Sequence, residues 1–181
     1  MFSANEPMLE EWLEFSQNIS LKKQLTVWLR CKAKAKITGA ECSEKLNITT
    51  PPYFGKLGIF ITLKKGKNVR GCYGAFSHTS TDIAVVLSEY LSGALTGDMR
   101  YKPLEISELE STDIIITIAS QPYAVADADS VDVLRYGIAI TCPDGLATVY
   151  VPAEIRNSLL IQKQLKGKDC QISAFRAVTI K

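Results

Sequence analysis

The sequence has little of what builds common metal and nucleic-acid sites. Its 181 residues include one histidine, and its five cysteines form no C-x-x-C pair. A structural zinc site needs about four closely organised ligands, so we predict no metal site. Lysine and arginine total 21 against 19 for aspartate and glutamate, a net charge of +2. Nucleic-acid-binding domains usually have clustered bases and a pI above about 9, so this balance does not favour nucleic acid as a partner.

Long hydrophobic runs are also missing. No segment approaches the roughly 20 apolar residues that cross a bilayer. The N-terminus, M-F-S-A-N-E-P-M-L-E-E, is acidic where a signal peptide would be basic and apolar. We therefore expect no membrane contact, a cytoplasmic location and cysteines in the form of reduced thiols. The cysteines are Cys31, Cys42, Cys72, Cys142 and Cys170.

The common catalytic and cofactor signatures are absent as well. The chain has no Walker A pattern, no H-E-x-x-H, no G-x-S-x-G and no dinucleotide-binding G-x-G-x-x-G. The string Gly71-Cys72-Tyr73-Gly74 is not a phosphate loop, because no helix start follows it directly. The sequence therefore does not identify a cofactor and leaves open whether the chain is an enzyme.

The most informative stretch is residues 58–76, G-I-F-I-T-L-K-K-G-K-N-V-R-G-C-Y-G-A-F. Two apolar, β-branched runs flank a lysine-rich connection, which predicts a hairpin with Gly66 and Asn68 at positive φ. The second strand contains Gly71 and Gly74. Glycine inside a strand usually marks a bulge or a close approach of backbone or ligand, so this strand is the best site candidate.

An arginine and a thiol lie among these glycines. A guanidinium near a thiol favours the thiolate, so Arg70 would lower the pKa of Cys72 below its ordinary value of about 8.5 and make it a candidate nucleophile. Alternatively, Cys72 is a small buried hydrophobe and Arg70 forms a structural ion pair. A Cys–His pair is not expected, because His78 would lie about 20 Å from Cys72 along a continuing strand.

The helical signals lie before and after this hairpin. Apolar residues at three- and four-residue spacing predict two helices over residues 8–34, with Asn18 and Ser20 between them and Ser20 capping the second. Another helix is predicted to begin near Asp82, and the pattern Ser107-x-x-Glu110 predicts a capping box on a short helix.

The later chain adds further strands. Residues 113–119, D-I-I-I-T-I-A, are apolar on both faces, which predicts a central strand. We also predict a hairpin over residues 137–151, a helix over 152–165 and a closing strand over 173–180. Hairpins mixed with helices predict an α+β protein with a mostly antiparallel sheet and flanking helices, in a single domain over residues 1–181.

The run F-I-T-L-K-K-G-K-N-V-R-G-C-Y-G resembles the signature of the AMMECR family, a Leu-Arg-Gly-Cys-Ile-Gly-like hexapeptide after a Val-Thr-Leu strand. The loop Asp98-x-Arg100-Tyr101-x-Pro103-Leu104 resembles the family's Asp-x-Arg-Phe-x-Pro-Leu. Tyr136 stands where the family commonly has histidine, so a histidine-dependent role is not expected there. The resemblance covers most of the chain. It implies a larger and a smaller lobe, interwoven, with a cleft between them, and it implies no reaction.

These residues together predict binding of a small anionic ligand or substrate in that cleft, by an enzyme or a component of an enzyme complex. Two converging guanidinium groups would suit a carboxylate or phosphate, with a nearby aspartate holding them in place. The alternatives are an RNA- or nucleic-acid-linked regulatory module, which would use the lysines of residues 64–67, and a noncatalytic protein-interaction adaptor. The predicted ligand-binding residues are Arg70, Gly71, Gly74, Asp98, Arg100 and Tyr101.

Overall fold

The computed structural model describes residues 6–128, 130–145, 147–152, 154–155, 161, 165 and 168–181. Its elements, in chain order, are α1 (Glu6–Gln17), α2 (Ile19–Thr38), β1 (Gly58–Lys65), β2 (Asn68–Ala75), α3 (Ile83–Ser92), a π-helical turn η1 (Gly93–Gly97), α4 (Ile106–Leu109), β3 (Asp113–Ala119), β4 (Tyr123–Ala124), β5 (Tyr136–Thr141), β6 (Ala147–Tyr150) and β7 (Gln171–Ile180). These elements confirm the predicted α+β class and the central position of residues 113–119. Most of the predicted helix over 152–165 lies outside the described residues.

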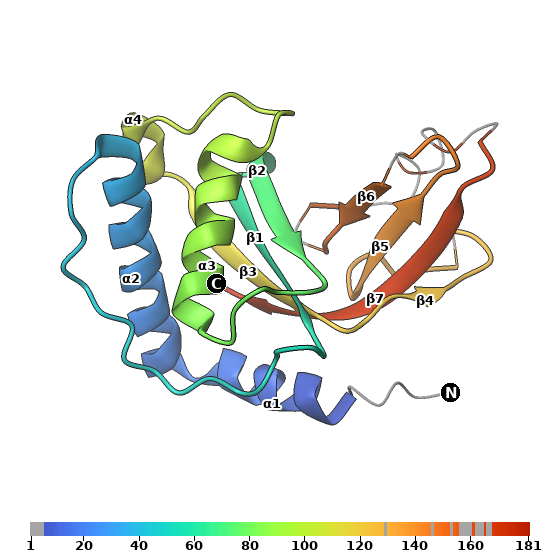
Figure 1. Cartoon of the computed structure of the whole chain (residues 1–181), viewed down its shortest axis with the longest axis horizontal. Helices are drawn as coiled ribbons and strands as arrows, with labels where there is room; N and C mark the ends of the chain where they lie inside the picture. Colours follow the sequence, from blue (N-terminus) through green and yellow to red (C-terminus); the bar gives the residue numbers. More distant parts are fainter. Residues whose placement is uncertain are drawn as a thin grey trace.

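One antiparallel sheet runs through the molecule in the order β2-β1-β3-β7-β5-β6, and the short β4 also pairs with β7. The C-terminal half of β7 pairs with β3, whereas its N-terminal half pairs with β5. The larger lobe holds α1, α2, α3 and α4 with β1, β2 and β3, and the smaller lobe holds β4, β5 and β6 (Figure 1). Because β7 belongs to both lobes, they are interwoven.

Three clusters of buried side chains hold this arrangement together. The first packs α1, α2 and α3 against β1 and β3, and includes Trp12 and Trp28. The second lies inside the smaller lobe around Ile138 and Ile140. The third joins the two lobes, and its buried members are Phe60, Ala119, Val151 and Phe175. Full burial of one large apolar side chain contributes about 1.5–3 kcal/mol, so the third cluster is a substantial link between the lobes.

The helix boundaries differ from the predicted ones in two places. Asn18, not Ser20, caps α2, because Asn18 has extended backbone angles and its side chain accepts the N–H of Leu21. The capping box of α4 is formed by Glu105 and Glu108, three residues apart, rather than by the predicted serine and glutamate.

The first hairpin spans the predicted residues and differs only at its turn. Gly66 has a φ of +58°, as predicted, but no residue other than glycine has a positive φ in the described chain, so the prediction for Asn68 is wrong. Asn68 instead begins β2 and pairs with Lys65 of β1. Pairing within the strand requires an extended backbone, which excludes the left-handed region.

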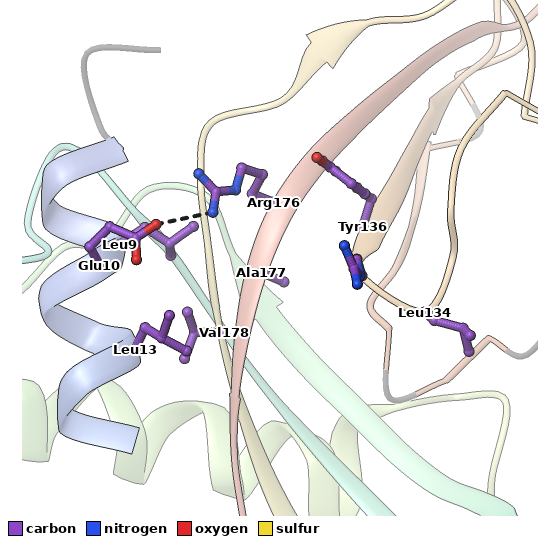
Figure 2. Close-up of a pocket in the computed structure, with 9 residues that line it drawn as sticks. Leu9, Glu10, Leu13, Leu134, Tyr136, Arg176, Ala177 and Val178 are labelled. Atoms are coloured by element: carbon purple, nitrogen blue, oxygen red, sulfur yellow. Dashed lines mark hydrogen bonds and ion pairs between the residues drawn. The ribbon is translucent and has the colours of Figure 1, made fainter. Parts of the chain in front are cut away.

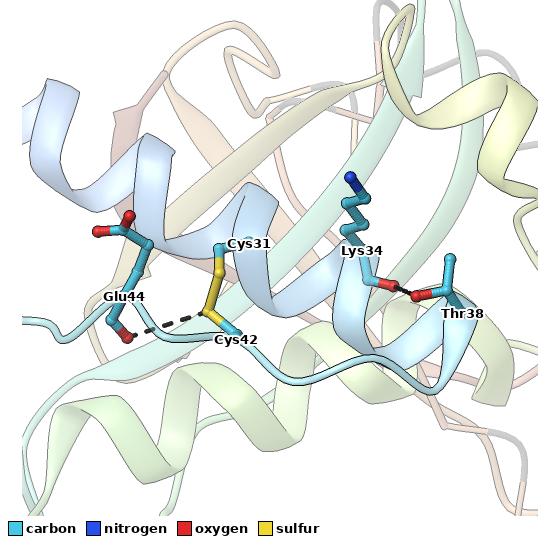
Figure 3. The surroundings of a disulfide bond; sticks show 5 residues. All are labelled: Cys31, Lys34, Thr38, Cys42 and Glu44. Atoms are coloured by element: carbon cyan, nitrogen blue, oxygen red, sulfur yellow. Dashed lines mark hydrogen bonds between the residues drawn. A yellow bond between two sulfur atoms is a disulfide. The ribbon is translucent and has the colours of Figure 1, made fainter.

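The prediction of reduced thiols is wrong for four of the five cysteines. Cys31 is bonded to Cys42, with 5.5 Å between their Cα atoms, and Cys142 is bonded to Cys170, with 4.1 Å between theirs. Figure 3 shows how the chain after α2 turns back so that Cys42 lies beside the helix at Cys31. This reversal, which begins at the left-handed Gly39, is not visible as a cysteine spacing. Among the described residues, no helix has the length and apolar character that crossing a bilayer requires.

Candidate functional site

The glycines of β2 are positions of close backbone packing. A Cβ on Gly71 would overlap the carbonyl oxygen of Ala94 in η1, and a Cβ on Gly74 would overlap the backbone of Ile59 and Phe60 in β1. Neither glycine has a positive φ. A glycine inside a strand was expected to mark either a bulge or a close approach. Close approach of another backbone accounts for both Gly71 and Gly74.

Arg70 lies at a β-bulge. Leu63 of β1 pairs with Gly71 and the next residue, Lys64, pairs with Val69, so Arg70 is an extra residue in β2. A bulge interrupts the alternation of side chains along a strand, and Arg70 pairs with α4 instead of lying beside Cys72. Its Nε and Nη2 donate to the two carboxylate oxygens of Glu108 at 3.0 and 2.8 Å.

This ion pair lowers the pKa of Glu108. The hydrogen bond from Arg70 is the largest cause that holds the pKa of Glu108 at about 2. Lys65 lies 3.7 Å from the same carboxylate. Arg70 therefore has the structural ion pair that was the alternative to a thiol-activating role.

Cys72 is the unpaired cysteine and is half-buried. Its Sγ lies 3.3 Å from Thr62 Oγ1, and its backbone N–H donates to Asp98 Oδ2 at 2.9 Å. Burial raises the pKa of the thiol well above its ordinary value, and the charge of Glu154 raises it further, against smaller lowering by the Thr62 hydrogen bond and Arg100. The predicted lowering is therefore wrong, because burial disfavours the thiolate, a carboxylate lies nearby and the bulge directs Arg70 to another partner.

Arg100 is held by carboxylates from both lobes. Its Nε and Nη2 donate to the two oxygens of Asp98 at 2.9 and 2.8 Å, and Nη2 also donates to Glu154 Oε1 at 3.2 Å. The arginine side chain is 46% exposed, whereas those of Asp98 and Glu154 are 7% and 5% exposed. The loop after η1 is thus joined to the chain that follows β6.

The pKa values of the two carboxylates are shifted in opposite directions. Burial tends to raise the pKa of Asp98, but hydrogen bonds from the Arg100 side chain and from the backbone N–H groups of Cys72 and Arg100 lower it overall. Burial raises the pKa of Glu154, and Arg100 offsets this only in part. Glu154 is therefore the group of the pair that gains a proton more readily.

A cavity of about 180 Å³ lies over this cluster. Its walls come from β2, the loop after η1, β6 and the chain after β6, so both lobes contribute. The Arg100 guanidinium carbon lies 5.4 Å from the centre of the Tyr101 ring. Within the described chain, no residue accepts a hydrogen bond from Nη1 of Arg100. The lining residues are Val69, Arg100, Tyr101, Tyr150, Glu154, Ile155 and Ile161.

The structure thus brings together only part of the predicted site. Cys72, Asp98, Arg100 and Tyr101 are close to one another, whereas Arg70 points to α4 and the two guanidinium groups do not converge. Glu154 was missed, because a single glutamate two residues after a proline carries no pattern that separates it from a surface acid.

The histidine has a structural role. His78 Nδ1 lies 2.8 Å from the hydroxyl of Tyr90, and Nε2 lies 2.8 Å from the carbonyl oxygen of Leu57. Both ring nitrogens are therefore engaged away from Cys72, in agreement with the expectation that no Cys–His pair forms. Across the described residues, no group of three or more His, Cys, Asp and Glu side chains is arranged to hold a metal ion.

Comparisons with known proteins agree with this architecture. The fold is similar to the crystal structure of an uncharacterized protein from Pyrococcus horikoshii, with a TM-score of 0.62 and 15% identity over 91% of this chain and 93% of that one. At this identity the likeness shows the fold alone.

Curated relatives match about half of the chain. A protein of Thermotoga maritima is 30% identical over 86 residues, 47% of this chain and 49% of that protein. A protein of Methanococcoides burtonii is 35% identical over 80 residues, 44% of this chain and 40% of that protein. The chain thus spans about half the length of the curated relatives it matches. The AMMECR1 family model, in contrast, matches residues 14–171, and the chain therefore belongs to the AMMECR1 family.

Proposed function

We propose that the cavity over Arg100 binds a small molecule carrying a carboxylate or phosphate, and that Nη1 of Arg100 is the group that recognises it. The observation that supports this proposal is that the Arg100 guanidinium is held in place by hydrogen bonds and is still exposed. Nε and Nη2 are engaged by Asp98 and Glu154, while the side chain is still 46% exposed. A guanidinium fixed in this way loses little conformational freedom when it binds an anion.

The size and lining of the cavity narrow the ligand class. A volume of about 180 Å³ is below the roughly 300–1,000 Å³ of pockets for drug-sized ligands, so the ligand is a small metabolite-sized acid. The rings of Tyr101 and Tyr150, with Val69 and Ile155, line the remainder. An apolar or planar body beside the acid group would contact these side chains.

The charges of the site favour binding at low pH. Asp98 and Glu154, when both ionised, exceed the single positive charge of Arg100 and oppose a further anion. The raised pKa of Glu154 allows it to take up a proton instead. Anion binding therefore involves proton uptake, and affinity is expected to fall as pH rises above the pKa of Glu154.

Cys72 supports this site through its backbone. Its N–H holds Asp98, which in turn holds Arg100. The raised pKa of the thiol does not support nucleophilic catalysis by Cys72. The proposal is accordingly one of ligand binding, with Gly71 and Gly74 allowing the close packing that places β2 under the cavity.

The experiment is a thermal-shift screen with small mono- and dicarboxylates and phosphate esters, followed by calorimetric titration of any ligand found. A ligand at one hundred times its Kd stabilises the native state by about 2.7 kcal/mol. Arg100→Gln should abolish the shift, each variant being compared with its own ligand-free melting temperature. Arg70→Gln is the matched control, because it also removes a carboxylate-paired arginine from this region but lies outside the cavity. Retention of the shift in Arg100→Gln would rule the proposal out.

A further inference from the structure

A second feature, away from Arg100, is the unequal pairing along β7. β5 pairs with β7 from Gln171 to Arg176, and its first residue, Tyr136, lies opposite Arg176. β7 continues to Ile180, and residues 177–180 pair with β3 on one side only. On the β5 side, the described chain provides no strand for residues 177–180, so this stretch is an open sheet edge.

The backbone of this edge faces outward at alternate residues. The carbonyl of Arg176 accepts the N–H of Ser120, and the N–H of Arg176 donates to Ser120 Oγ, so both groups face the β3 side. Successive residues of a strand direct their backbone groups to opposite sides. The pairing of Tyr136 with Arg176 directs the N–H of Ala177 toward the carbonyl of Arg135. The C=O of Ala177 and the N–H and C=O of Thr179 therefore face the open edge, where they can pair with another strand.

A cavity of about 620 Å³ adjoins the start of this edge, at Arg176, Ala177 and Val178. Figure 2 shows α1 on one side of β7 and Leu134 and Tyr136 on the other. Several walls are apolar, and Leu13 and Leu134 are 40% and 74% exposed. The complete lining is Leu9, Glu10, Leu13, Leu134, Arg135, Tyr136, Arg176, Ala177 and Val178.

We propose that residues 177–180 bind an extended peptide segment of a partner protein as an added β-strand. At about 3.3 Å per residue, the edge accommodates four or five peptide residues. Apolar peptide side chains would contact Leu13, Leu134 and Val178.

The charges of the lining select an acidic segment. Two arginines and one glutamate line the cavity, and Arg176 is paired with Glu10. The Arg135 side chain is 83% exposed and has a 3.8 Å contact with the exposed Asp132. An acidic peptide residue is therefore expected beside Arg135, with the affinity falling as salt rises.

An isolated segment fits this edge better than a second copy of the chain. The edge lies in a slot walled by α1 and by residues 134–136. A strand that already belongs to a sheet brings its neighbouring strands and helices, which would meet those walls. A single extended peptide brings none.

The probe is a displayed library of random octapeptides, selected against the full chain, with the best binder then synthesised and titrated. We expect binders with alternating apolar and acidic residues, and at least about tenfold slower hydrogen exchange at the Thr179 amide when the peptide is bound. Thr179→Pro removes one outward N–H, which the pairing with β3 does not use, and should weaken binding about tenfold or more. Arg135→Glu should weaken binding several-fold, whereas Lys23→Glu, an exposed charge reversal on α2, should not.

Failure of the peptide-binding proposal can be distinguished from failure of the proposed ligand site at Arg100, because Arg100→Gln should leave peptide binding unchanged. If Thr179→Pro does not fold, the exchange data and Arg135→Glu still decide. The proposal is overturned by the absence of enriched peptides, by binding that leaves the Thr179 amide unprotected, or by protection of the Thr179 amide through dimerisation of the chain without peptide.

Discussion

Arg70 and Cys72 lie two residues apart on β2 but have separate partners: Arg70 forms a two-bond ion pair with Glu108 on α4, and the Cys72 sulfur lies 3.3 Å from the Thr62 hydroxyl. The bulge at Arg70 is the cause. The cationic group beside Cys72 is instead Arg100, which is itself shared between Asp98 and Glu154. The chemistry of the stretch from Arg70 to Gly74 therefore depends on residues outside it.

Cys72 should react slowly with thiol reagents near neutral pH, because burial and the nearby carboxylate disfavour the thiolate. In unreduced protein the other four cysteines are disulfide-bonded, so labelling reports on Cys72 alone. The measurement is labelling across pH 6 to 9 with mass-spectrometric mapping. Arg70→Ala should leave the rate unchanged, and fast labelling that slows in this variant would contradict the geometry.

Gly71→Ala and Gly74→Ala should each destabilise the protein by about 1–3 kcal/mol, because the new methyl overlaps neighbouring backbone. For a chain of this size, each kcal/mol lowers Tm by about 2–4 °C. Gly97→Ala is the matched control, since its Cβ would lie 3.9 Å from Tyr73 and its φ is not positive. Urea unfolding of the three variants checks this. Equal stability of all three would mean that the packing around Gly71 and Gly74 relaxes without cost.

The contribution of Glu154 to stability should change with pH in the opposite direction to that of a carboxylate whose pKa is lowered on folding. Its pKa is raised in the folded state above the ordinary 4.5, mainly by burial. The contribution of Glu154 is therefore fully present below about pH 4.5 and is lost as pH rises through the folded pKa. The stability of wild type relative to Glu154→Gln should fall between pH 4 and pH 8, as measured by urea unfolding.

Glu108→Gln provides a control of opposite sign. The folded pKa of Glu108 is about 2, below its ordinary 4.5. Its contribution is present above about pH 4.5 and is lost as pH falls through 2, so wild type should lose its advantage over this variant in acid. A difference between wild type and Glu154→Gln that stays flat from pH 4 to pH 8 would mean that Glu154 is not shifted.

Each disulfide should contribute measurable stability. In the chain-entropy treatment, the bond between Cys142 and Cys170, 28 residues apart, contributes between about 3 and 4 kcal/mol, and the bond between Cys31 and Cys42, 11 residues apart, contributes about 3 kcal/mol. Calorimetry with and without a reductant checks this. The double variant Cys142→Ala/Cys170→Ala should lose part of the reductant effect, while Cys72→Ala should retain all of it. Insensitivity of wild type to the reductant would exclude both bonds as stabilising elements.

The sequence alone determined the features that depend on neighbours along the chain. The hairpin over residues 58–76 and the strand Asp113–Ala119 follow from apolar patterning, turn residues and β-branched composition, all of which act over a few residues. The close packing of Gly71 and Gly74 was also predictable, because a strand interior otherwise disfavours glycine.

Only the tertiary structure decided which side chains meet. The bulge that turns Arg70 toward Glu108 exists only through the pairing of β2 with β1. Glu154 reaches Arg100 across 54 residues of sequence, and β7 keeps an open edge because β5 begins opposite Arg176 and not later. These outcomes depend on strand register and on the packing of two lobes against each other. Such long-range contacts form by competition among many pairings, and no local pattern encodes the result.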